Sequence, residues 1–319
     1  MIAVGQVQNV EAKGKKKAVA EQPVPVVPEA LCDSMIIDLY ADIAPGSEGW
    51  THQEGIGENL GHQAVFNVVK PQLIAFIPAK DKAKGVAAVI CPGGGMTMLN
   101  FETEGTMVAR ELNRRGITAF VLKYRTLPLF DDGGNAVSNT EGMTNAAGRE
   151  CMTAIQKANE QFLVQGTTKW VLNIPTVNLS FADVDRAMSL IRENMGKWRL
   201  SKVGIVGFSA GAIASISQAQ THSPGSRPDF TCAIYGGWTN DVKVPEDAAP
   251  LYIIAVVNDI FTPEETMAPY YAWRDAKVPV GLHIFDHVKH GFGAVQTGKS
   301  ADRWIDLMTD FLADCEIIQ

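Results

Sequence analysis

The sequence predicts an α/β protein with a mostly parallel central sheet of about eight strands and helices on both faces. Short β-rich apolar runs recur along the chain, and segments with the 3.6-residue period of amphipathic helices lie between many of them. Strands interleaved with helices favour parallel pairing. The chain has 319 residues, 46% apolar and 20% charged, which is an ordinary globular composition and enough length to bury a sizeable core.

The first half of the chain supplies a βαβ unit. Residues 1–31 have no sustained period, which predicts a flexible lead-in before a single domain over residues 32–319. A helix is expected over 104–115, where the apolar residues follow a helical period and Gly116 ends the pattern. The strands expected in this half span 65–69, 73–77, 86–91 and 117–123.

The second half continues the alternation of helices and strands. We expect helices over residues 183–194, 210–220, 265–276 and 301–312. We expect strands over residues 203–208, 232–235, 251–257 and 280–285.

Charge, hydropathy and cysteine content exclude several classes of protein. The formal net charge is −7, and Lys15, Lys16 and Lys17 form too short a basic run to follow a phosphate backbone, so no nucleic-acid partner is expected. No apolar run approaches the roughly 18 residues of a membrane span. The five scattered cysteines indicate neither a disulfide framework nor a zinc cluster. The first residues show no secretory signal, so the chain is expected in the cytoplasm, or outside it if a signal has been removed.

The sharpest local signal is Gly-Phe-Ser-Ala-Gly at residues 207–211, directly after an apolar strand and directly before a helix. This pattern predicts a tight strand-to-helix turn, in which the flanking glycines avoid collisions and Ser209 lies at the carboxyl end of the strand. The helix N-terminus favours developing negative charge there. Ser209 is therefore the candidate nucleophile. The alternative is a helix-capping serine in a glycine-rich turn.

A serine hydroxyl is a weak nucleophile, so acyl transfer also needs a base, an orienting acid and donors for an oxyanion. His290, on a loop after the expected strand over 280–285, is the candidate base, and His287 is its competitor. Asp259 follows the strand over 251–257 and is the candidate acid. The candidate oxyanion donors are the backbone amides of Gly94, Gly95 and Ala210.

Two further patterns point to other chemistry, and we reject both. Residues 293–300 match the P-loop pattern G-x-x-x-x-G-K-S, but a phosphate-binding loop follows an early strand, and here only one helix remains. His283, His287 and His290 lack a Cys or Glu partner at metal-ligand spacing. We expect no metal and no cofactor.

Residues 126–181 interrupt the alternation, because they are far longer than a usual strand-to-helix connection. A helix is expected over about residues 144–164. The segment leaves the sheet at the carboxyl ends of the strands, where open parallel sheets bind ligands. We interpret it as a lid-like insertion over the active site. The alternative is that its apolar side chains form a small satellite core.

With these residues assembled, residues 73–312 resemble the α/β-hydrolase superfamily. Within it, they resemble the acetyl-esterase/lipase-like enzymes that include xylan acetyl esterases and related bacterial carbohydrate esterases. The most specific matches are the stretches 91–95, 112–116, 120–125, 183–187, 207–211 and 290–293. The sequence departs from many relatives at Cys91 and Pro92, where histidine is common, and at Ala212, where glycine is common.

The resemblance implies a triad of Ser209, His290 and Asp259 that needs no cofactor. We expect a serine carboxylester hydrolase that forms a covalent acyl-enzyme on an acylated carbohydrate or a small soluble ester. One alternative is a peptidase of the prolyl-oligopeptidase type, although such enzymes usually carry a propeller for which this chain is too short. The other is a non-catalytic binding protein, which would be expected to lose at least one triad member.

Overall fold

A central sheet of eight strands organises the molecule. The computed structural model describes residues 35–51, 53–127, 175–238, 241–257, 259 and 263–319. The strand order is β1-β4-β7-β5-β8-β9-β10-β11. The antiparallel pairs are β1 with β4 and β4 with β7, and the other neighbours are parallel. The mostly parallel sheet of the sequence analysis is confirmed.

The strands of this sheet are short and mostly apolar. They are β1 (Met35–Asp38), β4 (Gln72–Phe76), β5 (Val86–Cys91), β7 (Thr118–Lys123), β8 (Lys202–Phe208), β9 (Thr231–Ile234), β10 (Leu251–Val256) and β11 (Val280–Phe285). Every residue of β5, β7, β9 and β10 is buried, as expected for strands that are covered on both faces. A second antiparallel sheet contains β2 (Gly55–Asn59), β3 (His62–Phe66) and β6 (Met98–Leu99).

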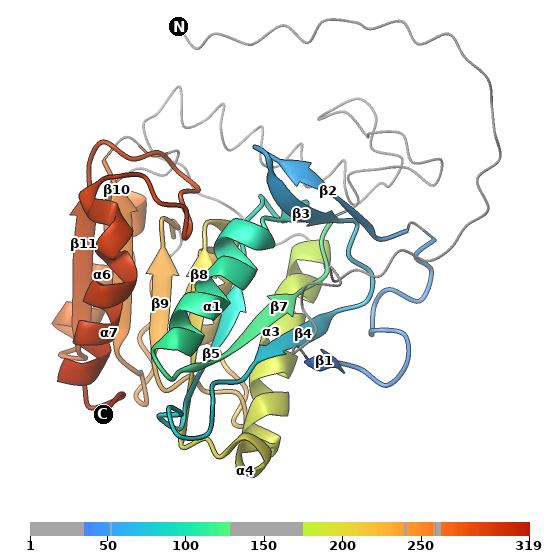
Figure 1. Ribbon diagram of the computed structural model, residues 1–319, viewed down its shortest axis with the longest axis horizontal. Coiled ribbons are helices and arrows are strands. Elements are labelled where there is room, and N and C mark those ends of the chain that lie inside the picture. The colour runs from blue at the N-terminus through green and yellow to red at the C-terminus, as the bar shows by residue number, and fades with distance from the viewer. Residues whose placement is uncertain (1–34, 52, 128–174, 239–240, 258, 260–262) are drawn as a thin grey trace, which may run out of the picture.

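Helices cover both faces of the main sheet (Figure 1). The α-helices are α1 (Met107–Arg114), α3 (Pro175–Glu193), α4 (Met195–Trp198), α5 (Ala210–Gln220), α6 (Pro263–Asp275) and α7 (Trp304–Asp314). A π-helical turn, η2 (Glu102–Thr106), leads into α1, and a 3-10 turn, η3 (Ser300–Arg303), leads into α7. On one face, Arg115 after α1 contacts Asp306 of α7. On the other face, α3 packs against α5, and Ala219 of α5 shares an apolar cluster with Trp273 of α6.

A buried ion pair anchors α3 to the chain that follows β7. The Asp183 carboxylate accepts hydrogen bonds from Arg125 Nε at 2.9 Å and Nη2 at 2.7 Å, and from the Arg125 backbone N–H at 2.9 Å. Ser180 Oγ donates to the Arg125 carbonyl at 2.6 Å. These contacts hold the chain on either side of residues 128–174 in one place. The matches at 120–125 and 183–187 are therefore part of the scaffold.

Several predicted boundaries are wrong. The strand expected over 65–69 is β3, which belongs to the small sheet and ends before Asn67, whose φ of 55° is incompatible with an extended strand. The eighth strand of the main sheet is instead β1, which the sequence analysis missed. The helix expected from residue 183 begins at Pro175, a residue type that the first turn of a helix tolerates.

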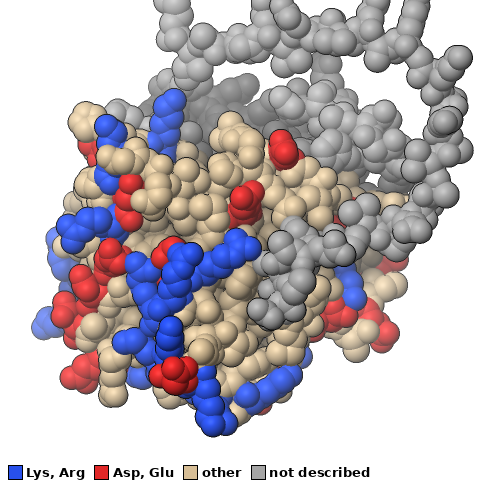
Figure 2. All heavy atoms as spheres, in the orientation of Figure 1, with Lys and Arg blue, Asp and Glu red and all other residues tan. Residues whose placement is uncertain are grey.

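Charged side chains of both signs lie together on the face that α1 covers (Figure 2). Arg114 and Arg115 both contact Glu111, and Arg115 also lies 2.5 Å from Asp306. These two arginines are therefore paired with carboxylates, unlike the unpaired cations of a basic stripe that tracks a phosphate backbone. Within the described residues, none of the helices has the length and apolar content needed to cross a membrane.

Candidate active site

The turn that carries Ser209 forms because two glycines allow β8 and α5 to approach each other. A Cβ on Gly207 would lie 2.1 Å from the Gly211 carbonyl oxygen, and a Cβ on Gly211 would lie 2.0 Å from the Cys91 carbonyl oxygen. Ser209 has a φ of 50°, and it is the N-cap of α5. Backbone strain of this kind is common at functional positions.

We expect Gly211→Ala to destabilise the protein strongly, because the added methyl group would meet the backbone carbonyl of β5. The free energy of unfolding should fall by about 3 kcal/mol or more, at or beyond the upper end of ordinary overpacking. Gly225→Ala is the matched control, since Gly225 is exposed and has open space around it. That change should leave stability within about 1 kcal/mol. Urea denaturation of both variants tests the prediction, and equal stabilities would contradict it.

The structure brings Ser209, His290 and Asp259 into one hydrogen-bonded row. His290 Nε2 lies 2.8 Å from Ser209 Oγ, and His290 Nδ1 lies 2.7 Å from Asp259 Oδ1. A carboxylate oxygen can only accept, so Nδ1 carries the ring proton and Nε2 is free to accept the proton of the serine hydroxyl. The side chain of Asp259 is 3% exposed and that of His290 is 23% exposed. This arrangement can move a proton away from Ser209.

The glycine loop after β5 lies against the serine. A Cβ on Gly93 would come within 2.7 Å of Ser209 Cβ. The loop closes tightly, since the Gly94 carbonyl accepts hydrogen bonds from the amides of Thr97 and Met98, both at 3.1 Å. Among the described residues, no group accepts a hydrogen bond from the amides of Gly94, Gly95 or Ala210. The loop thus places Gly93, which precedes the predicted donors Gly94 and Gly95, against the candidate nucleophile.

Sequence reasoning missed two buried residues beside this row, Glu104 and Tyr235. Glu104 accepts a hydrogen bond from the Gly93 amide at 2.7 Å, and the hydroxyl of Tyr235 donates to Glu104 at 2.7 Å. The ring of Tyr235 packs edge-on against that of His290, with 4.9 Å between centroids. Burial raises the pKa of the Tyr235 phenol well above its usual value, so the hydroxyl keeps its proton.

The other predicted histidines lie elsewhere. His287 has 79% of its side chain exposed and lies 3.6 Å from Asp286, so it does not compete for Ser209 in this structure. His283 lies on β11, with Nδ1 2.9 Å from the Tyr252 hydroxyl. Among the described residues, no group of three or more His, Cys, Asp or Glu side chains is placed to hold a metal ion.

The segment with the P-loop pattern has most of its polar groups engaged within the chain. The amides of Thr297 and Gly298 donate to the carboxylate of Asp302, both at 2.8 Å, and the Lys299 amide donates to Thr297 Oγ1. A carboxylate therefore occupies the position that a phosphate would need. The segment leads into η3, as the sequence analysis expected for the approach to the last helix.

The largest part of the predicted insertion lies outside the described residues, including the helix expected over 144–164. The predicted lead-in over 1–31 lies outside them as well.

Of the five cysteines, Cys91 and Cys232 are buried, and burial raises the pKa of both thiols. A buried thiol with a raised pKa carries little thiolate, so these two cysteines are typical of unreactive structural thiols.

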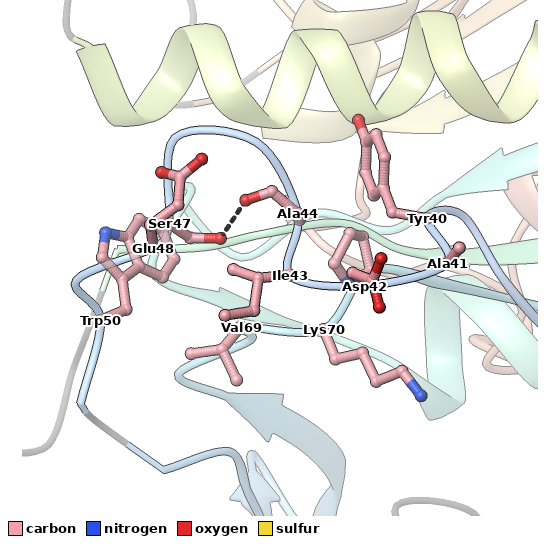
Figure 3. Close-up of a pocket in the computed structure, with 11 residues that line it drawn as sticks. Tyr40, Ala41, Asp42, Ile43, Ala44, Ser47, Glu48, Trp50, Val69 and Lys70 are labelled. Atoms are coloured by element: carbon pink, nitrogen blue, oxygen red, sulfur yellow. Dashed lines mark hydrogen bonds between the residues drawn. The ribbon is translucent and has the colours of Figure 1, made fainter.

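A separate cavity of about 410 Å³ is lined by residues that follow β1 and precede β4, two strands that stand four and three places from β8 in the strand order. Figure 3 shows Ile43 and Val69 close together in it, whereas the ammonium group of Lys70 points away. Lys70 contacts Asp38 at 2.6 Å, and the Tyr40 hydroxyl donates to Asp183 at 3.1 Å. None of the predicted site residues lines this cavity.

The sheet, its helices and the serine turn between β8 and α5 define an α/β-hydrolase fold. Residues 175–314 match the model of the dienelactone hydrolase family, and solved structures with the same fold are similar to the chain. The matched region includes Ser209, Asp259 and His290, whereas the glycine loop lies before it. The resemblance stated from the sequence is confirmed.

Two curated relatives and two solved structures are similar to this chain. An acetylxylan esterase of Xylanibacter ruminicola is 25% identical over 260 residues, which are 70% of this chain and 44% of that protein. Endo-1,4-beta-xylanase B of Butyrivibrio fibrisolvens is 23% identical over 262 residues, which are 69% of this chain and 34% of that protein. The chain thus spans less than half the length of these two relatives.

The two structures show the same fold. An acetyl ester-xyloside bifunctional hydrolase from Caldicellulosiruptor lactoaceticus has a TM-score of 0.58 and 19% identity, over 89% of this chain and 97% of that one. A thermophilic esterase from Thermogutta terrifontis has a TM-score of 0.53 and 15% identity, over 78% of this chain and 91% of that one.

Proposed function

We propose that the protein is a serine carboxylester hydrolase that acts through a covalent acyl-enzyme. The observation that carries the proposal is the hydrogen-bonded row of Ser209, His290 and Asp259. A row of this kind activates a serine hydroxyl, because the base accepts the hydroxyl proton while the buried acid holds the ring in the required tautomer. The names of the relatives, acetylxylan esterase and acetyl ester-xyloside hydrolase, support the same class of reaction.

In the first half-reaction, Ser209 Oγ attacks the ester carbonyl carbon and its proton passes to His290 Nε2. The tetrahedral intermediate carries a negative oxygen, for which the amides of Gly94, Gly95 and Ala210 are the proposed donors. The intermediate then breaks the bond to the alcohol oxygen, which leaves with the proton from His290. The acyl group remains on Ser209 as an ester.

In the second half-reaction, His290 Nε2 takes a proton from water and the resulting nucleophile attacks the acyl-enzyme. Collapse of this intermediate releases the carboxylic acid and returns the proton to Ser209 Oγ. The negative charge of Asp259, 2.7 Å from Nδ1, stabilises the imidazolium that forms in each half-reaction. The proposed cycle uses only groups of the protein and water.

For the substrate, we propose a small acyl group, with acetyl as the first candidate, on a carbohydrate or a small soluble alcohol. The support is the set of named relatives, which act on acetylated xylan or acetyl esters according to their names. A panel of acetyl, butyryl, feruloyl and peptidyl esters would rank the classes. Preference for a peptidyl substrate would favour the peptidase alternative.

The proposed function predicts stoichiometric reaction with a fluorophosphonate, which labels activated serines irrespective of the alcohol. Intact-protein mass spectrometry should show one adduct per chain, and peptide mapping should place it on Ser209. Aryl acetate hydrolysis should fall in proportion to labelling. A folded protein that hydrolyses no ester and takes up no label would overturn the proposal and leave the binding-protein alternative.

A further inference from the structure

Glu104 is a fully buried acid at the start of the helical segment that follows the glycine loop. Its relative exposure is 0%. It lies in η2, one turn before α1, and the same turn contributes Thr103 and Thr106 to the buried set. An isolated carboxylate in an apolar interior is unfavourable by several kcal/mol unless its oxygens accept hydrogen bonds. The hydrogen-bond donors around Glu104 therefore indicate its role.

Three groups donate to Glu104. Oε2 accepts the Gly93 amide at 2.7 Å and the Asn100 side-chain amide at 3.3 Å, and Oε1 accepts the Tyr235 hydroxyl at 2.7 Å. Burial raises the pKa of Glu104, whereas the hydrogen bonds from Tyr235 and Gly93 oppose that shift. All three partners are donors, so the ionised carboxylate is the form that satisfies them.

One of these contacts fixes the glycine loop. Gly93 immediately precedes the proposed oxyanion donors Gly94 and Gly95, and it lies against Ser209. Because the Gly93 amide is engaged by Glu104, the orientation of its peptide group is set. The next peptide unit has its own anchor, because the Gly93 carbonyl accepts the Asn100 amide at 2.9 Å. Since a peptide unit is planar, that bond also sets the direction of the Gly94 amide.

A second contact fixes the loop that carries His290. Tyr235 donates to Glu104 and at the same time accepts the Gly293 amide at 3.0 Å. Its ring packs against His290 at 4.9 Å and against Phe292 at 5.0 Å. The Ala294 amide donates to the carbonyl of Thr103, the residue before Glu104, at 2.9 Å. The histidine loop is thus held by η2 at two points.

We propose that Glu104 is a positioning residue, which holds the oxyanion loop and the His290 loop in one fixed arrangement around Ser209. This inference rests on the proposed function. Glu104 lies on neither loop and touches none of the three reacting side chains in the contacts above. It acts through Gly93 on one side and through Tyr235 on the other. A displacement of about 1 Å at such supports can lower a rate 100-fold.

The test compares Glu104→Gln with Tyr235→Phe. Glutamine keeps the shape of Glu104, but it places a donor on one side of the group, so either Gly93 or Tyr235 loses its acceptor. Phenylalanine keeps the ring against His290 and removes only the hydroxyl. We expect kcat for an aryl acetate to fall about 10–100-fold in Glu104→Gln, with KM changed by less than about threefold. Tyr235→Phe should show a smaller loss of the same kind.

The double variant tests whether the two residues act as one unit. Its loss of kcat should be smaller than the product of the two single losses, because both changes interrupt the same set of contacts. The rate of fluorophosphonate labelling should fall in parallel with kcat, since labelling uses the same base and oxyanion donors. If Glu104→Gln does not fold, the Tyr235→Phe variant carries the test.

Asp185→Asn is the control for a merely structural role. Asp185 is also a carboxylate with several donors, accepting from Gln218 at 3.1 Å and from Ser223 Oγ at 2.8 Å, but these lie near the end of α5 that is remote from Ser209. We expect this variant to melt at a lower temperature and to keep its kcat. All rates are measured well below each melting temperature.

The outcomes separate the two proposals. A wild-type protein without ester hydrolysis or labelling at Ser209 would overturn the proposed function, and this inference with it. An active, labelled wild type with unchanged kcat in both Glu104→Gln and Tyr235→Phe would overturn this inference alone, even if both variants were less stable.

Discussion

Replacing Ser209 with alanine should lower kcat for ester hydrolysis by about 10⁴–10⁶-fold and abolish fluorophosphonate labelling. The residual rate would come from binding and from the oxyanion donors, which the change leaves in place. The side chain of Ser209 is small and only 7% exposed, and the alanine Cβ occupies the same position, so the fold and the melting temperature should be retained. Steady-state kinetics and intact mass measure both effects.

The matched control is Ser217→Ala, which changes a serine two turns further along α5. That variant should hydrolyse esters and take up the label as the wild type does. Labelling that persists in folded Ser209→Ala would place the nucleophile on another residue.

Replacing His290 with alanine should cause a loss of similar size, because Ser209 then has no base to accept its proton. His287→Ala is the control, since it is a histidine of the same loop region with its ring in solvent. The double variant Ser209→Ala/His290→Ala should lose little more than either single variant, because the two residues act as a unit. Kinetics on one aryl ester can compare these four variants with the wild type.

Asp259→Asn should lower kcat by about 10⁴-fold with little change in KM, because an amide next to Nδ1 permits the wrong tautomer of His290. A damaging His287→Ala together with a harmless His290→Ala would show that the base is wrongly assigned.

The sequence predicted the central part of the fold well, for a physical reason. Strands β5 and β10, and β8 after Lys202, are buried and mostly apolar because both of their faces are covered, and this gives runs that are easy to locate. Strands β1 and β2 lie in antiparallel positions, and all of their residues are exposed or half-buried, so neither strand has a buried face. They carry little periodic signal, and both were missed.

The row of Ser209, His290 and Asp259 was predictable because each residue follows a strand at the carboxyl edge of a parallel sheet. Glu104 was not predicted, although its position offers a signal. It stands four residues before Val108, which is buried in α1, so helical spacing places a carboxylate on the apolar face. Its partner Tyr235 follows β9 without any motif, and only the tertiary structure reveals their contact.

The pairing of β5 with β8 has a consequence for the order of events during folding. These strands are neighbours in the sheet, yet the chain between Cys91 and Lys202 separates them in sequence. The entropic cost of closing a loop grows with its length, and sheets with many long-range pairings fold slowly. The glycine loop follows β5 and Ser209 follows β8, so these two parts of the site come together only when the two strands pair. The recovery of ester hydrolysis after dilution from denaturant should therefore follow the slow long-range step, and lag behind the far-UV signal of the helices.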